Sequence, residues 1–167
     1  MASETEISIT AATPADVGLI LDFIGKLAEY EHLSQEMHAT AALLQEHLFG
    51  ACPAAEALIA RVGSVAAGFA LFFSTFSTFV AKPGIWLEDL FVLPEHRRLG
   101  VGKKLLRRVA EIAVERGCGR LEWSVLDWNE PALELYRTMG AEPMSEWTTQ
   151  RLSGDAIGKL ARGELTS

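Results

Sequence analysis

Residues 94–106, PEHRRLGVGKKLL, place Gly100 and Gly102 where an amphipathic helix is predicted to begin. Each glycine costs about 0.5–1 kcal/mol relative to alanine inside a helix. The first four N–H groups of a helix have no acceptor within it, and the helix dipole adds positive potential there. Alternate glycines leave these amides accessible to an anion with several oxygens, and Arg97 and Arg98 can add charge-assisted hydrogen bonds. The spacing R-x-x-G-x-G therefore predicts a phosphate-binding loop.

Other phosphate-binding loops do not fit this spacing. A P-loop requires glycine at position 97 and Ser or Thr at position 104, where the chain has Arg97 and Lys104. A dinucleotide-binding fingerprint requires glycine at position 105, where the chain has Leu105. Residues 97–108 contain six basic residues and no acidic one, although the net charge of the chain is −7. This distribution indicates one small anionic ligand or a solvated helix face, and it argues against non-specific binding of nucleic acid.

A pair of carboxylates, Glu88 and Asp89, interrupts the apolar strand predicted over residues 85–93. Successive side chains of a strand point to opposite faces, so at least one carboxylate faces the interior unless a bulge intervenes. A buried carboxylate costs several kcal/mol unless it is partnered. The pair therefore indicates either a general base beside a substrate or one solvated acid with a structural ion pair.

The elements that position these residues follow from hydrophobic periodicity and caps. We expect a strand at Ile7 and Ile9, a helix from Pro14 to about Tyr30, and a second helix from Thr40 to about Gly50. After these, the pattern predicts strands over 57–62, 65–73 and 85–93, a helix from about Val101 to Gly117, a strand over 120–126, a helix from Pro131 to Gly140, and a final strand over 147–152. This order predicts one mixed α/β domain over residues 1–167.

Composition limits the class of protein. The chain has 167 residues, of which 49% are hydrophobic, and no apolar run approaches the roughly 18 residues of a membrane span. The N-terminus lacks the basic and apolar regions of a secretory signal. Cys52 and Cys118 are isolated, and the four histidines show no spacing typical of metal ligands. We expect a cytoplasmic protein that binds no metal, membrane or nucleic acid.

Three motifs in this order resemble the GCN5-related N-acetyltransferase (GNAT) superfamily: the R-x-x-G-x-G loop, WNEP at 128–131 and LYRTMGA at 135–141. They are most similar to its diamine (spermidine/spermine) and thialysine acetyltransferase branch. The resemblance covers nearly the entire chain. It implies a central mixed, mostly antiparallel, twisted sheet flanked by helices. It also implies acetyl-CoA as cosubstrate, a small-molecule amine as acceptor, and a homodimer.

The resemblance also implies roles for individual residues. Glu88 is expected to assist deprotonation of the amine through water, with Asp89 secondary, and Tyr136 to protonate the leaving thiolate. The backbone of Leu90, Phe91 and Val92 is expected to pair with the pantetheine arm. The remaining contacts to acetyl-CoA are expected from Arg97, Arg98, Gly100, Val101, Gly102, Lys103 and Asn129, and those to the amine from Tyr30 and Glu31. Periodicity alone leaves open that Tyr136 is a core tyrosine and that Asn129 is a turn or capping residue.

The chain departs from the diamine enzymes at two places. No acidic residue occurs between Glu56 and Glu88, and Gln150 stands where an aromatic residue is expected. Both departures weigh against long polyamines and favour thialysine, lysine-like amino acids or short diamines. The prediction is direct acetyl transfer, in a ternary complex, to the primary amine of a diamine, a polyamine or a lysine-like amine such as thialysine. The alternatives are a protein or peptide N-acetyltransferase and a non-catalytic acyl-CoA-binding regulator.

Overall fold

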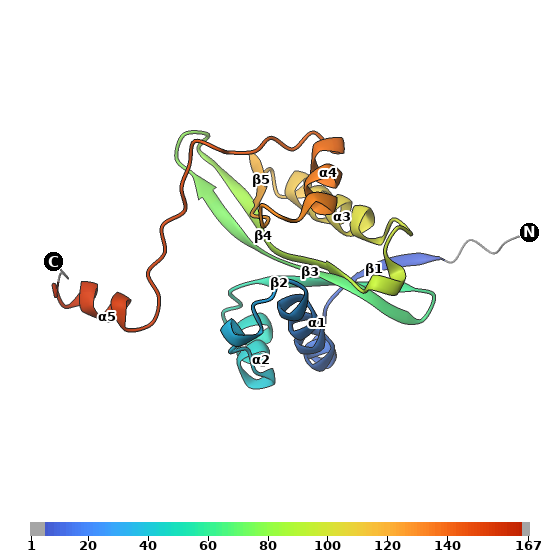
Figure 1. Cartoon of the computed structure of the whole chain (residues 1–167), viewed down its shortest axis with the longest axis horizontal. Helices are drawn as coiled ribbons and strands as arrows, with labels where there is room; N and C mark the ends of the chain where they lie inside the picture. Colours follow the sequence, from blue (N-terminus) through green and yellow to red (C-terminus); the bar gives the residue numbers. More distant parts are fainter. Residues whose placement is uncertain (1–5, 165–167) are drawn as a thin grey trace, which may run out of the picture. The chain divides into compact units, whose positions relative to one another are not determined.

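The computed structural model describes residues 6–164, and the chain divides into two compact units with the boundary between Ser124 and Val125. The first unit contains a five-stranded sheet in the order β1-β2-β3-β4-β5 (Figure 1). Its strands are β1 (Ile7–Ala11), β2 (Glu56–Val62), β3 (Val65–Ser77), β4 (Lys82–Val92) and β5 (Arg120–Trp123). Only β4 and β5 are parallel neighbours, which confirms the prediction of a mixed, mostly antiparallel sheet.

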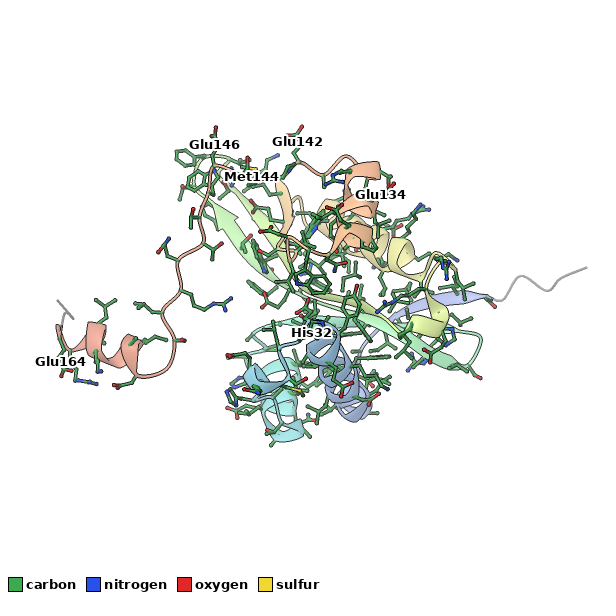
Figure 2. All side chains as sticks on the ribbon, in the orientation of Figure 1. His32, Glu134, Glu142, Met144, Glu146 and Glu164 are labelled. Atoms are coloured by element: carbon green, nitrogen blue, oxygen red, sulfur yellow. The ribbon has the colours of Figure 1, made fainter. Side chains whose placement is uncertain are left out.

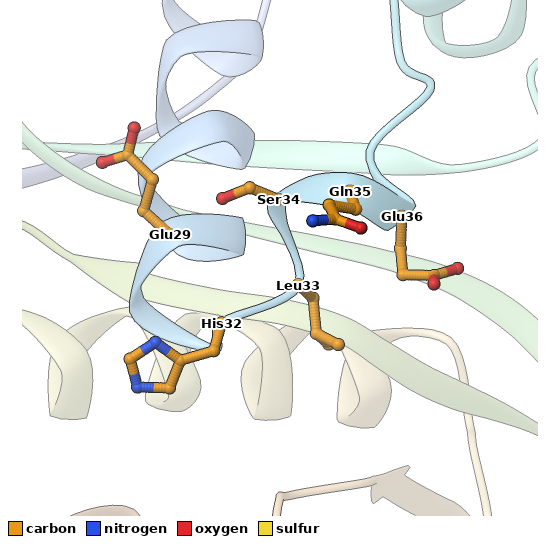
Figure 3. Close-up of a pocket in the computed structure, with 6 residues that line it drawn as sticks. All are labelled: Glu29, His32, Leu33, Ser34, Gln35 and Glu36. Atoms are coloured by element: carbon orange, nitrogen blue, oxygen red, sulfur yellow. The ribbon is translucent and has the colours of Figure 1, made fainter.

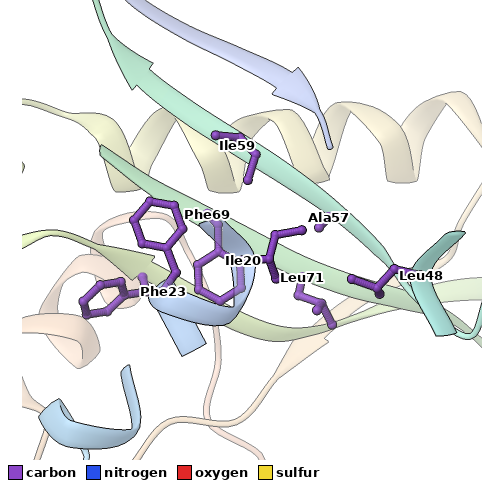
Figure 4. Packing of buried hydrophobic residues seen from close by; sticks show 8 residues of the cluster. Ile20, Phe23, Leu48, Ala57, Ile59, Phe69 and Leu71 are labelled. Atoms are coloured by element: carbon purple, nitrogen blue, oxygen red, sulfur yellow. The ribbon is translucent and has the colours of Figure 1, made fainter. Parts of the chain in front are cut away.

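Helices α1 (Val17–Tyr30) and α2 (Ala41–Phe49) cover one face of this sheet (Figure 1). Phe23 of α1 stacks on Phe69 of β3 with ring centroids 5.5 Å apart (Figure 4). The apolar cluster on this face consists of Ile20, Phe23, Leu48, Ala57, Ile59, Phe69, Leu71 and Phe91. Because Phe91 belongs to this cluster, the end of β4 is anchored beneath α1.

Helix α3 (Val101–Glu115) lies on the opposite face (Figure 1). Its buried side chains recur at the helical spacing expected from the sequence: Val101, Leu105, Leu106, Val109, Ile112 and Ala113. This apolar stripe starts at the first residue of the helix. Its burial therefore fixes the N-terminus of α3 against the end of β4, where Val92 lies near Gly102.

A capping box fixes the 3-10 turn Pro14–Asp16 that leads into α1. The Thr13 hydroxyl and backbone amide both donate to Asp16 Oδ2, at 2.9 and 2.8 Å. Arg61 of β2 also donates to Asp16, at 3.1 Å. Burial raises the pKa of Asp16, but the bonds from Thr13 and the charge of Arg61 outweigh it, and the net shift is downward.

The second unit contains α4 (Glu130–Thr138) and α5 (Asp155–Ala161). The strand predicted over 147–152 does not form, and that prediction was wrong. No neighbouring strand pairs with this segment, and an unpaired strand is not stable in water. The stretch between the helices is irregular, with Glu142, Met144 and Glu146 exposed (Figure 2). The prediction of a single domain over 1–167 stays a prediction.

Candidate active site

The loop between β4 and α3 turns sharply twice. After a 3-10 turn over Pro94–His96, Arg98 adopts φ +62° and Gly100 adopts φ +87°. A left-handed conformation costs a non-glycine residue about 1–2 kcal/mol, which Gly100 avoids and Arg98 does not. Such strain is typical of loops whose shape serves binding. We call residues 97–103 the anion loop.

Six consecutive amides of the anion loop lack a hydrogen bond of normal geometry within residues 6–164. The Arg97 amide donates to Pro94 O at 3.2 Å, and the Lys104 amide donates to Gly100 O at 3.0 Å. Between them, the amides from Arg98 to Lys103 make no hydrogen bond of normal geometry to any part of the chain that the structure describes. Amides of this kind at a helix N-terminus provide donors and positive potential for an anion.

Gly102 is not required by the packing of the chain. A Cβ added there would meet only Val92 Cγ2, at 3.7 Å, which is an ordinary contact. By contrast, a Cβ added at Gly68 would lie 2.4 Å from Phe91 O, so that position needs glycine for close strand packing. The bare Cα of Gly102 therefore leaves space beside the open amides, as a bound diphosphate requires.

The basic residues around the anion loop divide into two groups. Arg107 and Arg108 form surface ion pairs with Glu111, and Arg108 also pairs with Glu115 at 2.8 Å. Arg107 and Arg108 therefore belong to a solvated helix face and not to an anion-binding site. Arg98 and Lys103 are exposed and have no acidic partner within residues 6–164. Their charges remain available to an anion at the helix start.

The edge of β4 that faces β5 is paired only along part of its length. Residues Gly84 to Leu87 pair with β5, and the sheet provides no further strand there for Leu90 or Val92. The Leu93 amide donates to Ala67 O in β3, and Phe91 O also faces β3. By alternation, the backbone groups of Leu90 and Val92 point away from β3. This is the edge at which the pantetheine arm is expected.

A β-bulge places the two carboxylates of β4. Leu71 pairs with Asp89 and Phe72 pairs with Leu87, so Glu88 is the extra residue of the strand. Glu88 is exposed, and the indole N–H of Trp86 donates to its Oε2 at 2.8 Å. Asp89 is partly buried instead. The strict alternation of side chains along β4 is therefore interrupted at Glu88, as a bulge in this strand would require.

Asp89 lies in a negative environment. Burial, and then the charges of Glu88 and Glu31, raise its pKa from 3.8 to about 7. Burial also raises the pKa of Glu31, the residue after α1. Asp89 has no ion pair within residues 6–164, so the structural ion pair considered above is not found. We call Glu31, Glu88 and Asp89 the acidic cluster; it suits a cationic ligand.

A pocket of about 490 Å³ adjoins the end of α1 (Figure 3). It is lined by Glu29, His32, Leu33, Ser34, Gln35 and Glu36. His32 follows Glu31 directly and adopts φ +60°, which turns the chain out of the helix. Glu29 and Glu36 give this pocket two carboxylates, and none of the three residues of the acidic cluster lines it.

Tyr30, the last residue of α1, contacts the anion loop. The guanidinium carbon of Arg97 lies 4.6 Å from the centre of the Tyr30 ring, and Arg97 Nε donates to Val92 O at 3.0 Å. The Arg97 side chain is therefore directed toward α1 and β4. Sequence reasoning missed this contact and the Trp86–Glu88 hydrogen bond, because periodicity does not indicate which elements adjoin or where a strand bulges.

Asn129 and Tyr136 belong to the second unit, and their roles stay predictions. Asn129 occupies the N-cap position of α4, where its C=O accepts from Ala132 and Leu133 while its side chain does not cap the helix. Tyr136 is partly buried in the last turn, and α4 has no fully buried residue. A fully enclosed core tyrosine is therefore not observed.

Neither a metal centre nor a membrane-spanning helix is found among the residues that the structure describes. No group of three or more His, Cys, Asp or Glu side chains is arranged to hold a metal ion between residues 6 and 164. Over the same residues, no helix has both the length and the apolar character needed to cross a bilayer.

Comparison with known proteins gives a consistent result. Residues 25–141 match the model of the Acetyltransferase (GNAT) family. The chain is 37% identical over 166 residues to a thialysine N-epsilon-acetyltransferase of Sus scrofa, covering 93% of this chain and 97% of that protein. It is 50% identical over 93 residues to an L-ornithine N5-acetyltransferase of Arabidopsis thaliana, covering 56% of this chain and 41% of that protein. Among solved structures, an integron cassette protein from the mobile metagenome of V. cholerae matches 93% of this chain and 98% of its own, with 25% identity and a TM-score of 0.76.

Proposed function

This chain belongs to the Acetyltransferase (GNAT) family, and from that premise we propose that it transfers the acetyl group of acetyl-CoA to the primary amine of a lysine-like small molecule. Thialysine is the first acceptor to test. Proteins named thialysine N-epsilon-acetyltransferase from three mammals are 34–37% identical to this chain over most of its length. Short diamines and ornithine-like amino acids belong to the same chemical class.

The observation that carries this proposal is the run of six unpaired amides beside the space at Gly102. These amides, with the side chains of Arg98 and Lys103, supply donors for the diphosphate of acetyl-CoA. The backbone of Leu90, Phe91 and Val92 leads from the anion loop back to the acidic cluster. A thioester held along this edge of β4 would bring its acetyl group toward Glu88.

The acidic cluster supports the choice of a cationic acceptor. A lysine-like amine with a pKa of about 10.4 must lose a proton before it attacks, which costs about 4–5 kcal/mol at neutral pH. In this proposal exposed Glu88 accepts that proton through water, while Asp89 and Glu31 attract the cation. The neutral amine nitrogen then bonds to the acetyl carbon, the carbon–sulfur bond breaks, and the nitrogen releases its second proton to solvent. Tyr136, in the role that the family resemblance implies, donates a proton to the thiolate and regains one from solvent.

A thiol-release assay tests this function. Purified protein with acetyl-CoA is offered thialysine, lysine, ornithine, short diamines, spermidine, an aminoglycoside and a lysine-containing peptide. We expect release of coenzyme A to be fastest with thialysine or another lysine-like amine. Fastest turnover of the peptide would favour a protein acetyltransferase, and binding of acetyl-CoA without turnover of any amine would indicate a non-catalytic regulator.

Assembly and location belong to the same proposal. We propose a homodimer in the cytoplasm. Five exposed apolar side chains in the second unit support an interface between copies: Met144, Trp147, Leu152, Ile157 and Leu160. Sedimentation analysis of the purified chain would test the dimer, and a mass of about 18 kDa, that of one chain, would contradict it.

A further inference from the structure

Arg97 contacts two elements besides its own loop. Its guanidinium lies over the ring of Tyr30 at 4.6 Å and near the ring of Phe91 at 5.9 Å. Its Nε donates to Val92 O at 3.0 Å. The side chain is partly buried, whereas that of Arg98 is exposed. One guanidinium thus joins the last residue of α1 to the last residue of β4.

Each contact supplies something that the fold lacks at this point. Val92 O points away from β3 at an edge where the sheet offers no further strand, so Arg97 provides the donor that a neighbouring strand would provide. The Tyr30 ring presents its negative face to the planar cation. A lysine could keep the charge but could not keep the fork geometry or the stacking.

Tyr30 immediately precedes Glu31, and Val92 ends the strand that carries Glu88 and Asp89. The position of Arg97 therefore affects both ends of the acidic cluster. We propose that Arg97 is a positioning residue that fixes the end of α1 relative to β4, and so sets the acceptor site, and that its side chain is not a ligand of the diphosphate. This assignment rests on the proposed function, and it differs from the role that the R-x-x-G-x-G resemblance implied.

The test compares two acetyl donors. Acetyl-CoA carries the diphosphate, and S-acetylpantetheine lacks it. For Arg97→Gln with thialysine as acceptor, we expect the KM for the amine to rise at least about tenfold and kcat/KM to fall by the same factor with both donors. Binding of coenzyme A, measured by calorimetry, should stay within about threefold of the wild type. Arg98→Gln is the matched control and should show the reverse pattern, with weaker coenzyme A binding and little change toward S-acetylpantetheine.

A loss of coenzyme A affinity of about tenfold or more in Arg97→Gln, without loss toward S-acetylpantetheine, would overturn the proposal. Arg97→Lys provides a second variant that keeps the charge. It should resemble Arg97→Gln, and a wild-type KM for the amine would also overturn the proposal.

These outcomes are distinct from a failure of the proposed function. If the wild type turns over no amine, the proposed function fails. The calorimetric comparison of Arg97→Gln with Arg98→Gln still decides whether the Arg97 side chain binds the diphosphate, since it requires coenzyme A alone.

Discussion

The anion loop and the acidic cluster lie at the two ends of the same short stretch, the last residues of β4, yet they are built differently. The anion loop offers backbone amides, a helix dipole and the absence of a side chain at Gly102. The acidic cluster offers side-chain carboxylates brought together by a bulge and a helix end. The anion loop should therefore be most sensitive to an added side chain that blocks its amides, and the acidic cluster to the loss of a carboxylate.

The largest effect is expected at the backbone site. Gly102→Val fills the space beside the open amides and should weaken acetyl-CoA binding at least about 100-fold by calorimetry, because several hydrogen bonds to a charged ligand are lost together. Gly18→Val is the matched control, since Gly18 is likewise the second residue of a helix and has open space around it. Binding of acetyl-CoA at wild-type strength by Gly102→Val would refute the anion loop.

A substitution outside both regions should lower the rate of turnover without weakening the binding of acetyl-CoA. Tyr136→Phe removes the proposed acid and should lower kcat about 100-fold, while acetyl-CoA affinity changes by less than about twofold. Stopped assays of thiol release and calorimetry measure the two quantities. An unchanged kcat would show that Tyr136 is not the proton donor. Only the anion loop and the acidic cluster would then remain in the proposed mechanism.

The acidic cluster should make the stability of the fold depend on pH. The pKa of Asp89 is raised from 3.8 to about 7, so the folded state binds more protons than the unfolded state between these values. Stability conferred by the raised pKa of Asp89 is therefore fully present below pH 3.8 and is lost progressively as pH rises from 3.8 to about 7. Asp89→Asn removes the cost of ionising this buried carboxyl. Urea unfolding should show the variant more stable than the wild type by about 1–3 kcal/mol at pH 8 and equal to it at about pH 3.

The same variant should bind the amine less well. We expect the KM for thialysine to rise about tenfold in Asp89→Asn with little change in acetyl-CoA affinity. Glu36→Gln, an exposed residue of the adjoining pocket, serves as the control. A loss of acetyl-CoA affinity in Asp89→Asn would break the division between the two regions.

The smallest effect concerns the orientation of Glu88. Trp86→Phe keeps an aromatic ring and loses the N–H that donates to Glu88 Oε2, so kcat should fall about 3- to 10-fold. If Trp86 acts through Glu88, the same substitution should have no effect in a Glu88→Gln background. Trp147→Phe, at an exposed position, controls for loss of an indole elsewhere.

The difference between the two regions also explains what the sequence could predict. The anion loop could be predicted because glycine is costly in a helix, and because the spacing of Gly100 and Gly102 lies within one short segment. The periodicity of α3 is local as well, and it was predicted correctly. The arrangement of Glu88 and Asp89 depends on one extra residue opposite Leu71 and Phe72, which only the pairing of β3 with β4 reveals.

The remaining differences have the same origin. The contact of Arg97 with Tyr30 joins residues 67 positions apart, and nothing in either segment marks the other. The strand expected over 147–152 contains the β-branched residues Thr148 and Thr149, but strand formation depends on a neighbour rather than on its own residues. Helix α5 was missed because it has only seven residues and exposes Ile157 and Leu160 instead of burying a stripe.

The unpaired amides from Arg98 to Lys103 have a consequence for how the protein can be studied. Without an acceptor they exchange their hydrogens with deuterated solvent readily, whereas most helical amides are protected. A bound diphosphate would slow that exchange at the same six positions. Deuterium uptake by the peptide that spans them therefore measures cofactor occupancy directly, with no acceptor amine and no catalytic turnover.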